Sequence, residues 1–184
     1  MERKMNCMKP DSPSRTLPGL APHSGNPMIP GYYADPSLVQ HDGKFFVYAT
    51  LDPWGGDTLG CWESGDFQHW TYRFLNWPTV ETCVSSTATK TKVWAPSVVR
   101  ARDGRFYMYV SVGGEVWAGV AEHPLGPWRG ISTCPMIAAD YHPEYHMIDA
   151  EAFMDDDGSA WLYWGSGLNW INGRSAGRES GELF

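Results

Sequence analysis

Residues 33–50 read YADPSLVQHDGKFFVYAT, and the fold can be predicted from the pattern of this segment. A short apolar segment is followed by Asp42-Gly43 and then by a run rich in aromatic and β-branched side chains. Asp-Gly between two such runs is the strongest short signal for a β-hairpin, because the turn needs backbone with positive φ. The stretch therefore predicts two antiparallel strands joined by a tight turn.

The same pattern occurs twice more, in residues 95–111 (APSVVRARDGRFYMYVS) and in residues 149–165 (DAEAFMDDDGSAWLYWG). Residues 59–70 and 117–128 each resemble a third strand, a polar turn and an outer strand closed by a Trp. Four antiparallel strands in about 55 to 60 residues are typical of a propeller blade. A β-sandwich is the rival all-β fold, but a repeat with two hairpins in each unit favours the propeller.

The repeat divides the chain into three parts. Residues 1–25 are polar and Pro-rich, and we expect a flexible lead-in. Residues 26–168 contain two complete units and the first hairpin of a third, which predicts a partial propeller of about two and a half blades. Residues 169–184 lack β alternation and are expected to form an irregular C-terminal tail.

Composition limits the partners and the compartment. The formal net charge is −7, so we expect no binding to nucleic acid. The chain has no apolar run long enough to span a membrane and no signal-peptide pattern, which predicts a cytoplasmic protein, or a secreted one if the N-terminus is incomplete. The four cysteines form no CxxC pair, and no metal site is predicted from them.

Aromatic side chains make up 14% of the chain, with ten Trp and nine Tyr. Flat aromatic faces bind sugar rings well, but the same side chains also fill the cores of β-sheets. Both interpretations stay open for any single Trp.

The blade repeat also predicts where the chemistry lies. The first strand of each blade lines the central channel, and Asp35 and Asp149 begin that strand in blades one and three. Trp94 and Ala95 take the corresponding place in blade two. Two carboxylates beside an aromatic plane suit glycoside cleavage. The alternative is that each Asp only caps a turn.

Several ordered motifs resemble glycoside hydrolase family 43. They lie between residues 26 and 166 and are listed here: Asn26-Pro27, Tyr33-Ala34-Asp35-Pro36-Ser37, Val93-Trp94-Ala95-Pro96-Ser97, Gly126-Pro127-Trp128, and Ile148-Asp149 followed by Phe153 and Asp156-Asp157-Gly158. The resemblance implies an all-β fold of the five-bladed propeller type. It also implies inverting hydrolysis of α-L-arabinofuranosyl or β-D-xylosyl linkages in plant cell-wall polysaccharides and oligosaccharides.

The resemblance implies a role for individual residues. Asp35 matches the general base, and Asp149 matches the carboxylate that orients the acid and modulates its pKa. Trp94 matches a substrate-binding wall, and Ile148 and Trp54 are also expected to contact the sugar. The family's general acid is a Glu in the following blade, and no residue of this chain matches it; the other carboxylates considered are Glu115, Glu144 and Glu151.

Two further clusters have a structural and a functional interpretation. His142, Glu144 and His146 alternate and could bind a metal, but a solvated loop is the simpler interpretation. Asp155-Asp156-Asp157-Gly158 superficially resembles a calcium loop, yet it lacks the alternating ligands and the distal Glu, which favours a hairpin turn. A calcium ion in the channel is a feature of full-length relatives and is not assigned to residues here.

Three hypotheses follow from the sequence. The first is a family 43 hydrolase, and the second is a catalytically impaired fragment that at most binds sugars. The third is a homo-oligomer in which two copies pair their open blades.

Overall fold

The computed structural model describes residues 27–52, 55–88, 92–142, 145–165 and 179–182. These residues form eleven strands in three antiparallel sheets, and no helix occurs among them. No described segment is therefore a long apolar helix of the kind that crosses a membrane. The all-β class predicted from the sequence is confirmed.

Each sheet follows the order of the chain. The first contains β1 (Tyr33–His41), β2 (Lys44–Leu51), β3 (Gly60–Ser64) and β4 (Thr71–Tyr72). The second contains β5 (Val93–Arg100), β6 (Phe106–Val112), β7 (Glu115–Ala121) and β8 (Arg129–Gly130). The third contains β9 (Ile148–Met154), β10 (Ala160–Gly165) and β11 (Glu179–Glu182).

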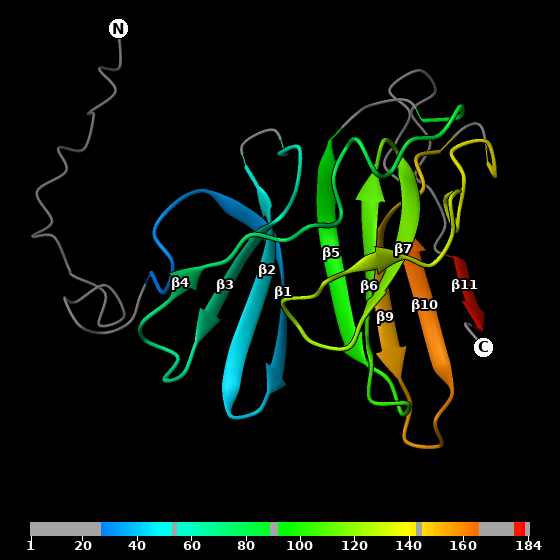
Figure 1. The fold of residues 1–184 in the computed structure, drawn as a ribbon. Helices are drawn as coiled ribbons and strands as arrows, with labels where there is room; N and C mark the ends of the chain where they lie inside the picture. The colour runs from blue at the N-terminus through cyan, green and yellow to red at the C-terminus, as the bar shows by residue number, and fades with distance from the viewer. Residues whose placement is uncertain (1–26, 53–54, 89–91, 143–144, 166–178, 183–184) are drawn as a thin grey trace, which may run out of the picture.

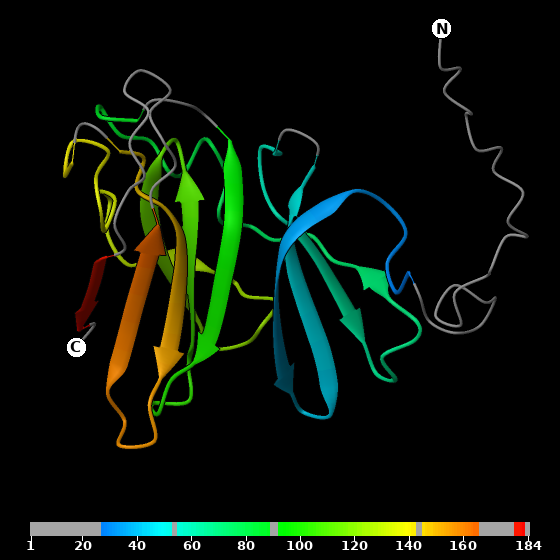
Figure 2. The same cartoon turned by 180° about the vertical axis from the view of Figure 1, so that it is seen from behind.

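The three sheets are arranged like the blades of a propeller. The strands β1, β5 and β9 run in the same direction, and their first residues lie at the upper end of the molecule in Figures 1 and 2. The strand β5 packs against both β1 and β9, whereas β1 and β9 do not contact each other. The first strand of every sheet is therefore an inner strand, which is the radial arrangement of a propeller and not the two stacked layers of a sandwich.

Turn chemistry explains the three hairpins. Asp42 and Gly43 both have positive φ (48° and 73°), as a two-residue hairpin turn requires. In the second and third hairpins only the glycine does, with φ 85° at Gly104 and 94° at Gly158. There the preceding Asp side chain accepts a hydrogen bond from the backbone N–H two residues later. All three hairpins predicted from the sequence are confirmed.

Apolar side chains join neighbouring blades. Phe46, Tyr48 and Cys61 of the first blade pack with Val98 and Met108 of the second in one buried cluster. A second cluster joins the second blade to the third; it includes Tyr109, Val116, Ala118, Ala150, Ala152 and Leu162. Each large side chain that is fully buried in this way stabilises the fold by roughly 1.5–3 kcal/mol. The inner strands are therefore held in fixed register with one another.

A serine hydroxyl on one inner strand accepts a hydrogen bond from the backbone of the next inner strand, and this contact recurs between blades. Ser37 on β1 accepts a hydrogen bond from the backbone N–H of Val98 on β5 (2.9 Å). Ser97 on β5 accepts one from Ala152 on β9 (3.0 Å). The equivalent position on β9 is Glu151, which is exposed on the open face of the third blade.

The outer strands differ from the prediction. Trp70 and Trp128 do not close an outer strand, because β4 and β8 begin one residue after them. These strands have only two residues each, and such a short edge strand has no apolar alternation to detect.

The tail predicted to be irregular contains a strand, because β11 pairs with β10 through residues 179–182. Backbone hydrogen bonds to the open edge of β10 form this strand, so no apolar pattern is needed. The predicted lead-in, residues 1–25, and residues 169–178 of the predicted tail lie outside the described part of the chain.

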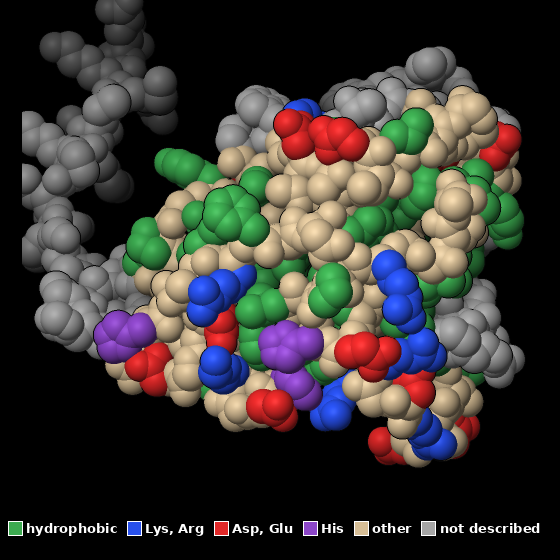
Figure 3. Space-filling model, in the orientation of Figure 1, with side chains coloured by type: hydrophobic (Ala, Val, Ile, Leu, Met, Phe, Trp, Pro, Cys, Tyr) green, Lys and Arg blue, Asp and Glu red, His purple; other side chains and the backbone are tan. Residues whose placement is uncertain are grey.

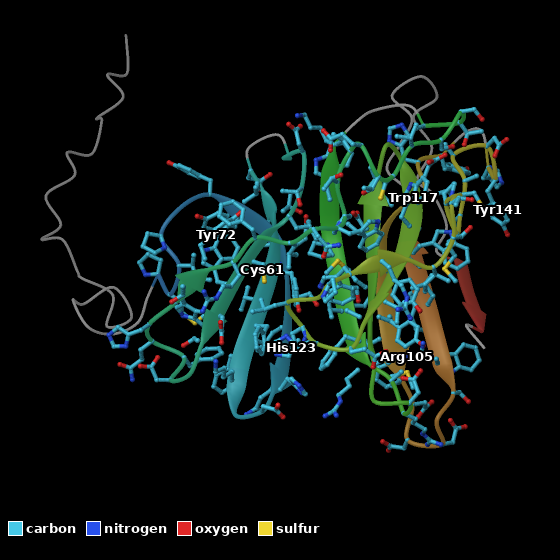
Figure 4. The ribbon with its side chains drawn as sticks, viewed as in Figure 1. Cys61, Tyr72, Arg105, Trp117, His123 and Tyr141 are labelled. Carbon is cyan, nitrogen blue, oxygen red and sulfur yellow. The ribbon has the colours of Figure 1, made fainter. Side chains whose placement is uncertain are left out.

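The two ends of the blades differ in surface character. On the face drawn in Figure 3, the histidines and most Lys and Arg side chains lie toward the lower end, where the hairpin turns are. His123, labelled in Figure 4, belongs to this lower region, and its ring lies 5.3 Å from that of His41. The inner strands begin at the opposite end, and the candidate site is there.

Candidate active site

A backbone irregularity recurs at the start of every inner strand. Asp35, Ala95 and Asp149 have positive φ (52°, 45° and 58°), and each lies at a shift in the strand register. A left-handed backbone at a residue other than glycine costs about 1–2 kcal/mol and is uncommon. A bulge of this kind re-aims side chains at the end of a strand. The three residues therefore occupy equivalent positions at the end of the molecule where the inner strands begin, which is called the rim below. Ala95, not Trp94, is the counterpart of the two aspartates.

Asp35 and Asp149 share an electrostatic environment. Both side chains have solvent contact, yet the protein around Asp149 displaces enough water to raise the pKa of its carboxyl. The negative charge of Asp35 raises the pKa of Asp149 further. Since β5 lies between β1 and β9, the two carboxylates act on each other across the intervening inner strand.

Two hydroxyl groups hold the bulges in place. The Thr50 hydroxyl donates to Asp35 Oδ2 (2.9 Å) and accepts from the Ala95 N–H (2.8 Å). In the next blade, the Ser111 hydroxyl accepts from the Asp149 N–H (2.9 Å). Each strained residue of blades two and three is thus tethered to the second strand of the blade before it.

Trp94 precedes the bulge of the second blade and is half-buried. A Cβ added to Gly55, where φ is +77°, would lie 2.0 Å from Trp94 Nε1. The loop after β2 therefore packs directly on the edge of the indole, and only glycine fits there. Ile148 is the counterpart of Trp94 in the third blade and is also half-buried. Trp54 lies outside the described residues.

Of the other carboxylates considered, Glu115 is enclosed and Glu151 is exposed. Glu115 is 0% exposed, and its Oε1 accepts hydrogen bonds from Ser85 (3.0 Å), Thr87 and the Ala139 N–H (3.3 Å). A substrate cannot reach this carboxyl in the structure. Glu151 lies two residues after Asp149, beyond the bulge, and both residues are exposed. Glu144 is not among the described residues.

The family described as Glycosyl hydrolases family 43 matches residues 24–177, which is most of the chain. The chain belongs to this family. The resemblance seen in the motifs is confirmed.

Family 43 relatives with assigned activities differ in the sugar they release. The β-D-galactofuranosidase xynD of Aspergillus niger is 31% identical over an alignment of 157 positions, gaps included, which covers 77% of this chain and 45% of the relative. An arabinoxylan arabinofuranohydrolase of Bacillus subtilis is 23% identical over an alignment of 203 positions, gaps included, which covers 95% of this chain and 40% of the relative. This chain therefore spans less than half the length of either relative.

Solved structures of the family share the fold. A family 43 arabinoxylan arabinofuranohydrolase from Bacillus subtilis, in complex with cellotetraose, superposes with a TM-score of 0.66 at 20% identity. The match covers 86% of this chain and 39% of that structure. The sheets described above are thus part of a five-bladed family 43 propeller.

The two clusters weighed as metal sites in this family 43 chain are residues 142–146 and residues 155–158. Among the described residues, no three His, Cys, Asp or Glu side chains come together as metal ligands. His142 packs against Tyr145, with ring centroids 4.8 Å apart. Asp157-Gly158 forms the turn of the third hairpin, as the hairpin interpretation predicts.

Thr50 and Gly55 contact the candidate site but were not predicted from the sequence. A signal for Thr50 exists, because Thr50 and Ser111 end the aromatic run of the first two repeats at the same place. The signal for Gly55 is weaker: Gly55-Gly56 follows β2, but nothing local indicates that an indole from the next blade lies against it.

Proposed function

We propose that this chain forms the part of a glycosidase that carries the general base and the orienting carboxylate for inverting hydrolysis of α-L-arabinofuranosyl or β-D-xylosyl linkages. The observation that supports the proposal most is that Asp35 and Asp149 occupy equivalent bulges at the start of inner strands, where the charge of Asp35 helps to raise the pKa of Asp149. Paired carboxylates in one site are the usual machinery of glycoside cleavage. The substrate is an oligosaccharide or polysaccharide that contains arabinose or xylose.

The mechanism assigns a proton transfer to Asp35 and an orienting role to Asp149. Asp35 takes a proton from a water molecule as that water attacks the anomeric carbon from the face opposite to the leaving group. The attack on the opposite face inverts the configuration at that carbon. Asp149, whose pKa is raised, orients the group that protonates the leaving oxygen, and that acid comes from outside the described residues.

The half-buried indole of Trp94 and the side chain of Ile148 flank the two carboxylates along the rim. The flat indole suits the C–H face of a pentose ring. Because Gly55 packs on the indole edge, the ring cannot turn away without moving the loop after β2. These two residues are proposed to set the position of the sugar over Asp35.

A panel of aryl glycosides tests this function. Substrates with activated leaving groups need little acid assistance, so a chain with a working base turns them over even where the acid is weak. We expect hydrolysis of 4-nitrophenyl α-L-arabinofuranoside or β-D-xyloside, with the inverted sugar anomer appearing first in the proton NMR spectrum. The β-D-galactofuranoside is the third member of the panel.

Two outcomes contradict the proposal. Release of the retained anomer would exclude Asp35 as a base that activates water. No turnover of any aryl glycoside, together with measurable binding of arabinose or xylose oligosaccharides in calorimetry, would make the chain a sugar-binding module.

A further inference from the structure

Thr50 has hydrogen-bond partners that define the direction of its hydroxyl proton. The side chain is 2% exposed and sits on β2, opposite Ala34. The Ala95 N–H can only donate, so the Thr50 oxygen accepts that bond (2.8 Å). An ionised carboxylate can only accept, so the single hydroxyl proton goes to Asp35 Oδ2 (2.9 Å). The partners leave Thr50 no alternative arrangement while Asp35 is charged.

The second blade contains the same tether without the carboxylate. Ser111 accepts from the Asp149 N–H (2.9 Å), as Thr50 does from the Ala95 N–H. The bulge residue in the blade of Ser111 is Ala95, which has no carboxyl group to receive the hydroxyl proton. The tether between blades is therefore a general feature of the repeat, and the contact with a carboxylate is particular to the first blade.

We propose that Thr50 is a positioning residue that aims the base. This proposal rests on the function proposed above. The hydrogen bond to Oδ2 fixes the rotation of the Asp35 carboxylate and leaves Oδ1 as the oxygen that takes the proton of the attacking water. The β-branched Thr side chain has few χ1 rotamers, and its near-complete burial reduces them further.

Thr50 also links Asp35, the proposed base, to the backbone next to Trp94. The second bond of its hydroxyl holds the N–H of Ala95, the residue that follows Trp94. One hydroxyl group thus connects the carboxylate that activates water to the strained backbone beside the indole. A shift of either group would lengthen one of the two hydrogen bonds, so the Asp35 carboxylate and the backbone beside Trp94 keep a fixed distance from each other.

The test compares Thr50→Val, Thr50→Ser and Ser37→Ala. Thr50→Val keeps the shape and loses both hydrogen bonds, whereas Thr50→Ser keeps them. Ser37→Ala is the matched control, because it loses a bond between the same two blades, to the Val98 N–H, without touching the Asp35 carboxylate.

The first measurement needs no activity. We expect Thr50→Val to move the carboxyl ¹³C signal of Asp35 and the amide proton signal of Ala95, and Thr50→Ser and Ser37→Ala to leave both near their wild-type positions. If Thr50→Val does not fold, Thr50→Ala is compared with Thr50→Ser in the same way. An Asp35 carboxyl signal that is the same with and without the hydroxyl overturns the proposal.

The second measurement is kinetic. With an aryl arabinofuranoside, Thr50→Val is expected to lower kcat about tenfold with KM within about twofold of wild type, because a misdirected base affects the chemical step more than binding. A Thr50→Val protein with the kcat of Ser37→Ala contradicts the proposal. A wild-type chain with no turnover contradicts the proposed function and leaves the carboxyl signal to decide on Thr50.

Discussion

Asp35→Asn is expected to lower kcat for an aryl α-L-arabinofuranoside by about 10²–10⁴-fold, the usual contribution of a general base. Asparagine has nearly the shape of aspartate and tolerates a positive φ, so the bulge at φ 52° survives the change. An amide cannot take a proton from water, and activation of the leaving group does not replace that step. The rate of nitrophenol release at saturating substrate measures the effect.

Asp42→Asn is the matched control for this variant. Asp42 also has positive φ (48°), and it lies in the turn at the far end of the same hairpin. The substitution removes the same charge from the same blade and should leave kcat within about twofold of wild type. An Asp35→Asn protein with the kcat of Asp42→Asn would show that Asp35 is not the base.

Glu115→Ala is expected to lower the free energy of unfolding by about 3 kcal/mol. The carboxyl is 0% exposed and receives hydrogen bonds from Ser85, Thr87 and the Ala139 N–H. Its removal leaves three part-buried donors without their acceptor, and each donor that is left unpaired costs up to about 1–3 kcal/mol. Every residue of β7 is buried, Trp117 included (labelled in Figure 4), so the loss of the Glu115 side chain also leaves a cavity in a packed sheet.

The same substitution should affect the site. Ser85 and Thr87 belong to the connection that leads into β5, and Ala139 belongs to the one that leads into β9. Glu115 therefore holds together the two segments that deliver Trp94 and Asp149 to the rim.

The control for this position is Glu115→Gln, whose amide oxygen still accepts hydrogen bonds. We expect it to lose about 1 kcal/mol in urea denaturation. Equal losses for Glu115→Ala and Glu115→Gln would mean that the carboxyl oxygen is not what anchors the two connections.

Much of the fold could be predicted because hairpins are encoded locally. A glycine with positive φ between two apolar runs identifies each blade's inner hairpin, as Gly43, Gly104 and Gly158 do. The outer strands β4, β8 and β11 could not be predicted in the same way, because they are short and lie at a blade edge. Their pairing depends on backbone groups offered by β3, β7 and β10, which no local pattern records.

The candidate site was predictable only in part. The repeat register places Asp35 and Asp149 at equivalent positions, and the shared bulge at the rim agrees with that register. The contacts of Thr50 and Gly55 are made to the following blade, Ala95 in one case and Trp94 in the other. Such contacts depend on how two sheets pack, and residues that are some 40 positions apart carry no joint signal in a single sequence.

Radial packing of the blades brings Asp35 and Asp149 within electrostatic reach of each other. A carboxyl ¹³C titration of Asp149 in the wild-type protein and in Asp35→Asn tests this claim most directly, with Asp42→Asn as the control. A nearby negative charge favours the protonated form of a carboxyl, so the pKa of Asp149 should be above its ordinary value in the wild type and should fall when Asp35 is neutralised. The same pKa of Asp149 in wild type and Asp35→Asn would contradict the account.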